Sequence, residues 1–164
     1  MKALRIIMLV VTIALMITIF CLSAETAKES SATSRGLIKK VISVFVKDFY
    51  DLPLEKQNAI AAPFQFIVRK SAHFTLYFLL GVSSLISFLT YNKPNNKLKC
   101  LISAGFCLAY AVSDEIHQRF VPGRSGELRD VAIDFCGAVL GICIIMIGYK
   151  LLKRKGKRKF SNNC

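Results

Sequence analysis

The sequence has little histidine, proline and glycine, and few acidic residues. It contains two histidines, four prolines, nine glycines and ten acids among 164 residues. There is no low-complexity tract and no repeat of fixed period, so we expect neither a disordered linker nor a repeat array. We therefore predict a single domain over residues 1–164.

The scarcity of histidine argues against a metal centre. The sequence has no HxxxE and no CxxC arrangement, and closely spaced ligands of this kind are typical of metal sites. His73, Asp114 and His117 would form such a site only if their helices converged closely. Most cysteines fall within apolar runs, where cysteine is usually a small packing residue: Cys21, Cys100, Cys107, Cys136 and Cys143. We expect no metal and no other cofactor.

Apolar residues are abundant, at 54% of the chain with a mean hydropathy of +0.47. Four apolar runs approach the roughly 20 residues that a helix needs to cross the hydrocarbon core of a membrane. Only helices satisfy their own backbone hydrogen bonds in lipid. The fold class that we predict is all-α, a polytopic membrane protein with four transmembrane helices over residues 5–23, 66–91, 98–117 and 129–152.

The first apolar run also has to be compared with a cleaved signal peptide. Its apolar stretch, Ile6 to Leu22, is longer than the roughly 7–15 residues of a signal segment. Leu22 stands where a small residue would be needed, and Phe20 before Cys21 spoils a lipoprotein processing site. We expect a retained transmembrane helix.

The distribution of basic residues predicts the orientation of these helices. Twelve of the 23 lysines and arginines, and no acid, lie on the side of the predicted spans that carries both termini. All ten acids lie on the other side. The positive-inside rule therefore places both termini in the cytoplasm of a multi-pass plasma-membrane protein. Because topology accounts for the net charge of +13, the basic tail at 153–164 predicts contact with membrane lipids and not with nucleic acid.

The outer loop at 24–65 is long, and part of it has helical periodicity. Residues 22–34 are polar and are expected to be flexible. Farther along, apolar residues recur at helical spacing, with lysines opposite: Ile38, Val41, Ile42, Phe45 and Phe49. We predict an interfacial amphipathic helix that lies on the outer membrane surface or caps the bundle.

Ionisable residues form stripes at the outer ends of three predicted spans. The first stripe is Arg69, His73 and Tyr77, and the second is Tyr110, Asp114, His117 and Gln118, with Glu115 a quarter-turn away. The third is Asp130 and Asp134, followed by a GxxxG pair at Gly137 and Gly141 that allows close approach of another backbone. Intramembrane charges usually face a partner or water. We therefore predict one shared cavity, in which Arg69 or His73 lies about 3 Å from an acid.

Arg124 follows the Pro122–Gly123 turn between the last two predicted spans. An arginine on such a turn, close to a helix N-terminus, is suited to an anion. A phosphate would fit this position, and so would Glu115 or Asp130.

Two motifs resemble those of the VanZ family of small bacterial membrane proteins. They are "RKSAHFTLYFLLG" and "DEIHQRFVPGRSGELRDVAIDFCGAVLG", and the resemblance extends from the residues after the first span to Gly141. Family members often have Asn in place of Asp134 and Gln in place of Glu25. The resemblance implies an association with low-level teicoplanin resistance in Gram-positive bacteria, and no established reaction. It maps the family's functional pattern to Arg69, Lys70, His73, Asp114, Glu115, His117, Gln118, Arg124 and Asp130.

Three functions are compatible with these residues. The first is an enzyme acting on a lipid-linked or cell-wall component, with a hypothetical acid–base cluster of His73, His117, Asp114 and Glu115. The second is a non-catalytic protein that holds a lipid headgroup, a wall precursor or the lipid tail of a drug. In both, the candidate substrate- or anion-binding residues are Arg69, Lys70, Gln118, Arg124, Asp130 and Asp134. In the third, the charges pair with one another and lock the helices together. The sequence leaves the oligomeric state open.

Overall fold

A computed structural model describes the backbone of residues 2–161 and the side chains of residues 2–153. Within these residues every regular element is a helix, which confirms the all-α prediction. The elements are α1 (Lys2–Ala24), α2 (Ala27–Phe45), the short 3-10 helix η1 (Phe49–Asp51), α3 (Leu54–Ala61), α4 (Phe64–Leu89), α5 (Asn96–Gln118) and α6 (Leu128–Ser161). The side chains of the predicted basic tail beyond Lys153 lie outside the described part of the chain.

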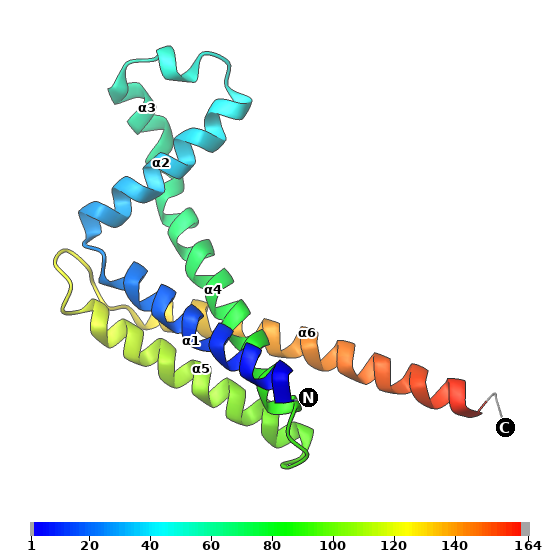
Figure 1. Ribbon diagram of the computed structural model, residues 1–164. Helices are drawn as coiled ribbons and strands as arrows, with labels where there is room; N and C mark the ends of the chain where they lie inside the picture. The colour runs from blue at the N-terminus through cyan, green and yellow to red at the C-terminus, as the bar shows by residue number, and fades with distance from the viewer. Residues whose placement is uncertain (1, 162–164) are drawn as a thin grey trace.

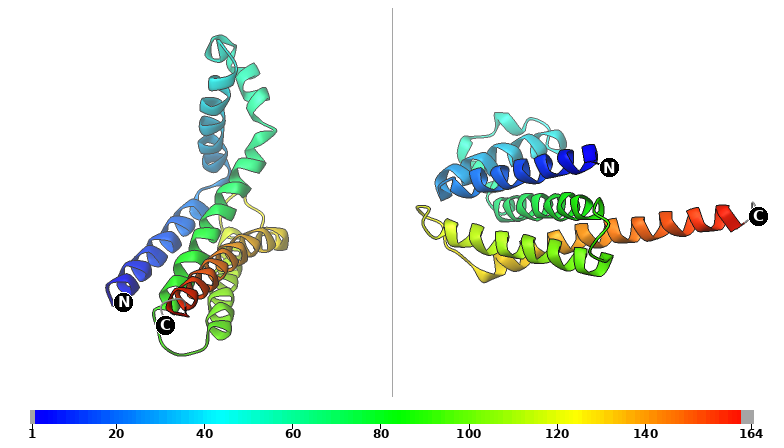
Figure 2. Two further views of the ribbon diagram at one scale, coloured as in Figure 1. Left: turned by 90° about the vertical axis from the view of Figure 1, so that its right-hand side faces the viewer. Right: turned by 60° about the horizontal axis from the view of Figure 1, so that its bottom comes forward.

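Helices α1, α4, α5 and α6 pack into a bundle, and α2 and α3 project from one end of it (Figure 1). The start of α1 and the end of α6 lie toward the opposite end, as the other views also show (Figure 2). The segment between α5 and α6 lies beside the end of α1, where the Ala27 amide donates to the Pro122 carbonyl at 3.3 Å. The outer ends of three predicted spans are thus gathered at one end of the bundle.

Three of the helices are long and apolar enough to cross a membrane: α1, α4 and the Leu128–Lys153 part of α6. Much of the apolar surface of α1 faces away from the bundle, with Ile6, Val10 and Ile17 well exposed. This arrangement is typical of a membrane protein, in which lipid covers the outward side chains. Helix α5 has 23 residues, but it has charged residues near both ends and does not meet the same criterion within residues 2–153.

Glycines allow the backbones of α4 and α6 to approach closely. A Cβ atom added to Gly137 would lie 2.4 Å from the Phe74 carbonyl oxygen, and one added to Gly141 would lie 2.3 Å from that of Phe78. Gly81 makes the reciprocal contact, 2.3 Å from the Ala138 carbonyl oxygen. No side chain fits in these positions, so the predicted close packing at the GxxxG pair is confirmed.

Helix α2 begins earlier than its apolar periodicity indicates, and the prediction that residues 22–34 are flexible is wrong. The Glu29 amide donates to the Thr26 hydroxyl, and the Glu29 carboxylate accepts from the Thr26 amide at 2.9 Å. This capping box satisfies two backbone donors that a helix start leaves free. The Thr26 hydroxyl also donates to the Glu29 carboxylate at 2.8 Å. This hydrogen bond, together with the one from the Thr26 amide, lowers the pKa of Glu29 from its ordinary value.

The apolar face predicted for the outer loop is only partly covered by protein. Ile38 and Phe49 are buried, whereas Val41 and Phe45 are 60% and 82% exposed. Helix α2 ends at Phe45, so Phe49 lies in η1 and not on the same helix. The helix packs against α4, and its buried residues are Ser30, Ser34 and Ile38. It leaves an apolar strip open to its surroundings.

Candidate functional site

A polar cavity of about 200 Å³ lies at the end of the bundle where α2 and α3 project. Its walls come from the first half of α4, the end of α5, the α5–α6 segment and the first turns of α6. It is lined by Ala27, Phe66, Arg69, Lys70, His73, Glu115, Gln118, Gly123, Arg124, Ser125, Glu127, Asp130 and Asp134. Eight of the ten predicted site residues line this cavity. Seven of them are ionisable, and the eighth is Gln118.

Two of the predicted stripes meet directly between α4 and α6. Lys70 and Asp130 form an ion pair, with side chains 24% and 12% exposed. One turn farther along, His73 Nδ1 lies 3.9 Å from Asp134 Oδ2. The prediction of one shared cavity agrees with this arrangement. We predicted that Arg69 or His73 would lie about 3 Å from an acid, but His73 is farther than this from Asp134. The close contact with an acid is made instead by Lys70.

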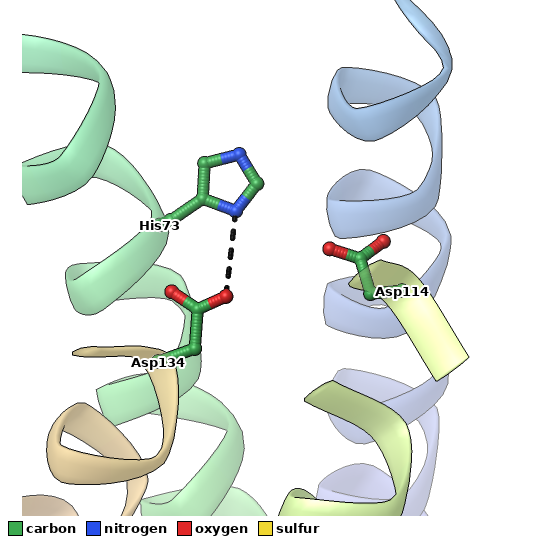
Figure 3. Close-up of side chains that lie close together, drawn as sticks. All are labelled: His73, Asp114 and Asp134. Carbon is green, nitrogen blue, oxygen red and sulfur yellow. Dashed lines mark ion pairs between the residues drawn. The ribbon is translucent and has the colours of Figure 1, made fainter. Parts of the chain in front are cut away.

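Asp114 extends the same cluster across to α5. A ligand atom from each of His73, Asp114 and Asp134 lies within 4.8 Å of the others. Figure 3 shows one Asp114 oxygen turned toward the His73–Asp134 pair. Three helices that are distant in sequence therefore contribute to one small group of side chains.

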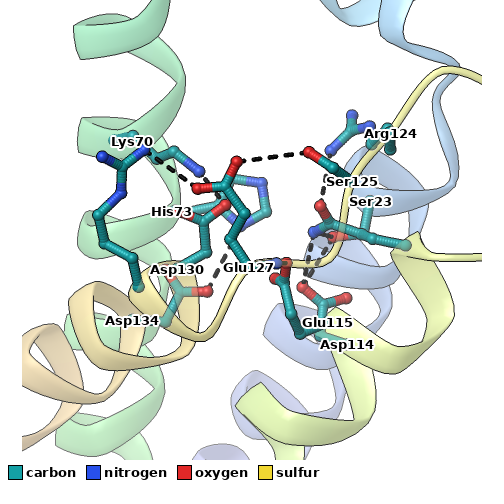
Figure 4. A network of polar contacts seen from close by, with 12 residues as sticks. Ser23, Lys70, His73, Asp114, Glu115, Arg124, Ser125, Glu127, Asp130 and Asp134 are labelled. Carbon is teal, nitrogen blue, oxygen red and sulfur yellow. Dashed lines mark hydrogen bonds and ion pairs between the residues drawn. The ribbon is translucent and has the colours of Figure 1, made fainter.

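The two acids of α5 are almost completely buried, each at 4% exposure. Asp114 accepts a hydrogen bond from the Ser23 hydroxyl at 2.8 Å and one from the Gln118 amide at 3.3 Å. Glu115 accepts from the Glu127 backbone amide at 2.5 Å (Figure 4). The sequence analysis missed Ser23, and the only signal for it was a hydroxyl at the outer end of an apolar helix.

Arg124 contacts the end of α1, which sequence analysis did not anticipate. It donates to the backbone carbonyls of Leu22 and Glu25, both at 2.9 Å, and to the Gln118 side-chain oxygen at 3.3 Å. The last carbonyls of a helix have no intrahelical donor and carry partial negative charge. Arg124 thus caps α1, and no described contact joins it to Glu115 or Asp130, the acidic partners considered for it.

Burial lowers the pKa of Arg124 from its ordinary value, and the nearby charge of Arg69 lowers it further, against the opposite effect of Glu25. Arg69 itself lines the cavity from α4. Its Nε is buried and has no hydrogen-bond partner among the described residues. The cavity therefore holds two guanidinium groups within electrostatic reach of each other, one of them without a local acceptor at Nε.

The sequence profile of the VanZ/LLP1 family matches residues 8–150. The chain belongs to this family. Comparison with curated proteins gave no match. Comparison with solved structures also gave none. The matched region includes all of the cavity and stops just before the basic end of α6.

Two of the ten predicted residues of this VanZ/LLP1 chain, Asp114 and His117, do not line the cavity. His117 packs against α1. Its ring stacks on Phe20 of α1, with centroids 4.6 Å apart, and it does not line the cavity. Its Nε2 is buried without a hydrogen-bond partner among the described residues. Asp114 also stands behind the cavity wall, but it reaches His73 and Asp134. Of the two histidines, His73 therefore opens into the cavity and His117 does not.

Proposed function

We propose that the chain is a multi-pass plasma-membrane protein whose outer polar cavity binds the anionic group of a lipid-linked component of the cell envelope. The observation that carries this proposal is Arg69, a cation in the cavity wall whose buried Nε has no acceptor. A buried donor without a partner costs about 1–3 kcal/mol, and more for a charged group. An anionic oxygen in the cavity would remove that cost.

The charges around Arg69 favour an anion over a neutral ligand. Lys70 is already paired with Asp130, and Arg124 is directed to the end of α1. Arg69 is not paired with an acid among the described residues, and it lies close enough to Arg124 to lower its pKa. A phosphate or carboxylate between the two guanidinium groups would relieve their repulsion and accept planar, charge-assisted hydrogen bonds.

The surroundings of the cavity favour a ligand that also has an apolar part. Phe66 lines the cavity, and it is 44% exposed. Lys70 and Arg129 lie over its ring, with Lys70 Nζ 5.4 Å and the Arg129 guanidinium carbon 5.2 Å from the centroid. Leu128, at the start of α6, is 82% exposed. A headgroup in the cavity would thus leave its chains against apolar surface that bilayer lipid covers.

The proposed topology makes α5 a fourth transmembrane helix, with both termini in the cytoplasm. At about 1.5 Å per residue, its 23 residues span roughly 34 Å, enough for the hydrocarbon core. The charge asymmetry supports this orientation, and the open apolar strip of α2 would then lie on the outer membrane surface. A cytoplasmic reporter fused after Lys159 should be active, and the same reporter inserted at Ser31 should be inactive. The reverse pattern would place the cavity on the wrong side for an envelope ligand.

An envelope ligand would connect the cavity to the teicoplanin resistance that the family resemblance implies. If the cavity held a wall precursor or the lipid tail of the drug at the outer face, that molecule could not take part in the binding of the drug to the wall. This part of the proposal concerns physiology, and the cavity supports it only through the chemistry of the ligand.

The test compares Arg69→Gln with Arg129→Gln. Arg129 is at the same end of the bundle and lies over the ring of Phe66, which lines the cavity, but its side chain is 63% exposed and paired with Glu127. Native mass spectrometry of the protein, extracted with its membrane lipids, measures retained anionic lipid. We expect Arg69→Gln to lower retention roughly tenfold or more, the effect of a charge-assisted hydrogen bond. Arg129→Gln should change it little. Equal retention by both variants and the wild type would contradict the proposal.

A structural role is the second candidate, and the contacts of Arg124 favour it for that residue. Three hydrogen bonds join it to α1 and α5, so its removal should loosen the bundle whether or not a ligand binds. Substitution of Arg69 therefore tests ligand binding, and substitution of Arg124 tests the structural role, within one cavity.

A further inference from the structure

Asp114 and Asp134 are buried close together, and the described part of the chain places no lysine or arginine in an ion pair with either of them. Each is 4% exposed. The recorded partners of Asp114 are the neutral Ser23 hydroxyl and Gln118 amide. Among the described residues, the one ion pair of Asp134 is with His73, at 3.9 Å. Two ionised carboxylates this deeply buried are costly unless a cation or a proton compensates them.

The geometry points to a divalent metal ion. We propose that His73, Asp114 and Asp134 bind Zn²⁺ or a metal ion of similar coordination chemistry. Ligand atoms from all three residues already lie within 4.8 Å of one another, and they come from α4, α5 and α6. One imidazole and two carboxylates are a donor set that zinc accepts, and the two carboxylates balance the charge of a 2+ ion.

An independent observation at Asp114 supports a ligand in this space. Its Oδ2 accepts both hydrogen bonds, while Oδ1 is buried with no hydrogen-bond partner among the described residues. Ser23 and Gln118 therefore orient the carboxylate and leave one oxygen free, as residues that surround a metal ligand usually do. Figure 3 shows one oxygen of Asp114 turned toward the other two side chains.

The distances require only a small contraction. Zinc bonds of about 2.0–2.2 Å place tetrahedral ligand atoms roughly 3.3–3.6 Å apart, so the three side chains would each move inward by about 1 Å or less. The backbones of α4 and α6 are fixed nearby, where Gly137 contacts the Phe74 carbonyl, and side-chain rotation alone can supply the movement. The Tyr77 hydroxyl, one helical turn from His73, is fully buried without a partner in the described residues, and it is a donor available to a carboxylate that binds metal.

The open side of such a site faces the cavity. His73 and Asp134 line the cavity, and Asp114 closes the group from behind. A metal held by three protein ligands keeps a position for water or for an oxygen of another molecule. This inference does not depend on the anion-binding proposal, because the metal ligands and Arg69 are different residues and metal binding is measured by itself.

The experiment uses the full chain, purified in detergent with an affinity tag that lacks histidine, stripped with EDTA and titrated with Zn²⁺ by isothermal calorimetry. Metal content after reloading is measured by inductively coupled plasma mass spectrometry. We expect one tightly bound equivalent in the wild type and roughly a 100-fold or greater loss of affinity in His73→Gln and Asp134→Asn, more than the 10–100-fold of an outer-shell change. Thiols elsewhere in the chain would bind zinc similarly in every variant, so the difference belongs to the three residues.

Asp130→Asn is the matched control. Asp130 lines the same cavity on the same helix as Asp134, but it pairs with Lys70 and is not among the three proposed ligands. This variant should lose far less zinc affinity than Asp134→Asn, because it removes a nearby charge and no metal ligand. Cobalt absorption of the reloaded wild-type protein should show a low-symmetry site, and it should disappear in His73→Gln. A wild-type protein that binds no stoichiometric metal would overturn the proposal, as would an Asp130→Asn variant that loses as much affinity as Asp134→Asn.

Discussion

The interface between α4 and α6 has two halves that are held together in different ways. In one half Gly81, Gly137 and Gly141 bring the two backbones into contact, with no room for a single Cβ atom. In the other half, toward the end that carries the cavity, side chains bridge the helices through the Lys70–Asp130 and His73–Asp134 pairs. The two halves adjoin on the same helices, because Gly137 contacts the carbonyl of Phe74, the residue after His73.

The difference indicates how the charged side chains are positioned. Backbone contact is rigid, because atoms that touch at van der Waals distance cannot approach farther, whereas an ion pair tolerates many separations. The glycine half therefore fixes the spacing of the helices, and the charged half occupies a gap of set width. The charged groups in such a gap are held at a fixed separation. An interface with the same salt bridges but without the glycines would not fix that separation.

The most damaging change should be in the glycine half. Gly137→Leu places a Cβ atom 2.4 Å from the Phe74 carbonyl oxygen, and because that atom belongs to the backbone the helices must separate. We expect a loss of about 3 kcal/mol or more, at or above the upper end for overpacked cores, measured as thermal stability in detergent. Gly148→Leu on the same helix is the control, because a Cβ at Gly148 meets nothing within 4 Å. Equal stability of the two variants would show that the close approach does not fix the interface.

Removal of Arg124 should have the next largest effect. Arg124→Gln loses the charge-assisted hydrogen bonds to Leu22 and Glu25, and we expect a loss of roughly 2–3 kcal/mol. Hydrogen exchange at the last turn of α1 should increase more than exchange in the middle of α4. Arg129→Gln, which removes an exposed arginine from the same end, should leave both unchanged. Uniform destabilisation without faster exchange at the end of α1 would contradict the capping role.

The Lys70–Asp130 pair should contribute less. A fully buried pair that loses one member costs about 3–5 kcal/mol, but these side chains are partly exposed, so we expect about 1–2 kcal/mol for Lys70→Met. The double variant Lys70→Met, Asp130→Asn should recover most of this loss, because neither charge is left unpaired. A double-mutant cycle with no coupling energy would show that the charged half does not contribute to the interface.

The smallest effect should come from the capping box of α2, which lies outside the interface. Hydrogen bonds from Thr26 lower the pKa of Glu29, so its stabilisation is complete above the unfolded-state pKa and is lost as the pH falls through the folded-state pKa. Acidification should therefore fray the first turn of α2, seen as faster amide exchange near residue 29, and leave the α4–α6 contacts intact. Glu29→Gln should remove this pH dependence.

The sequence predicted the meeting of the polar stripes better than the partners within them. Spacing along each helix placed His73, Asp114 and Asp134 on faces that do converge. Spacing could not say how the helices are rotated against one another, and the rotation turns His117 onto Phe20. Periodicity gives the face of a helix, but not the neighbour that the face will meet.

Two other features explain why local patterns were insufficient. The Thr26-x-x-Glu29 signature was present in the sequence and predicts a helix start, but the polar composition around it was interpreted as flexibility. Arg124 is different, because its partners are backbone carbonyls. Every residue has a carbonyl, so no residue type marks where such a partner lies.

That recognition through the backbone has a consequence for exchanging parts of the protein. Arg124 donates hydrogen bonds to the backbone carbonyls at the end of α1 and to none of its side chains. Much of the helix is exposed to the surroundings. Its side-chain hydrogen bonds to other helices are confined to Arg5, Thr12 and Ser23 within the described residues. A foreign apolar helix that kept these three positions, together with the packed Ile19 and Phe20, and ended at the same register should assemble into the chimera. The outward side chains of the first helix are in this respect replaceable, because they are exposed at the surface of the bundle.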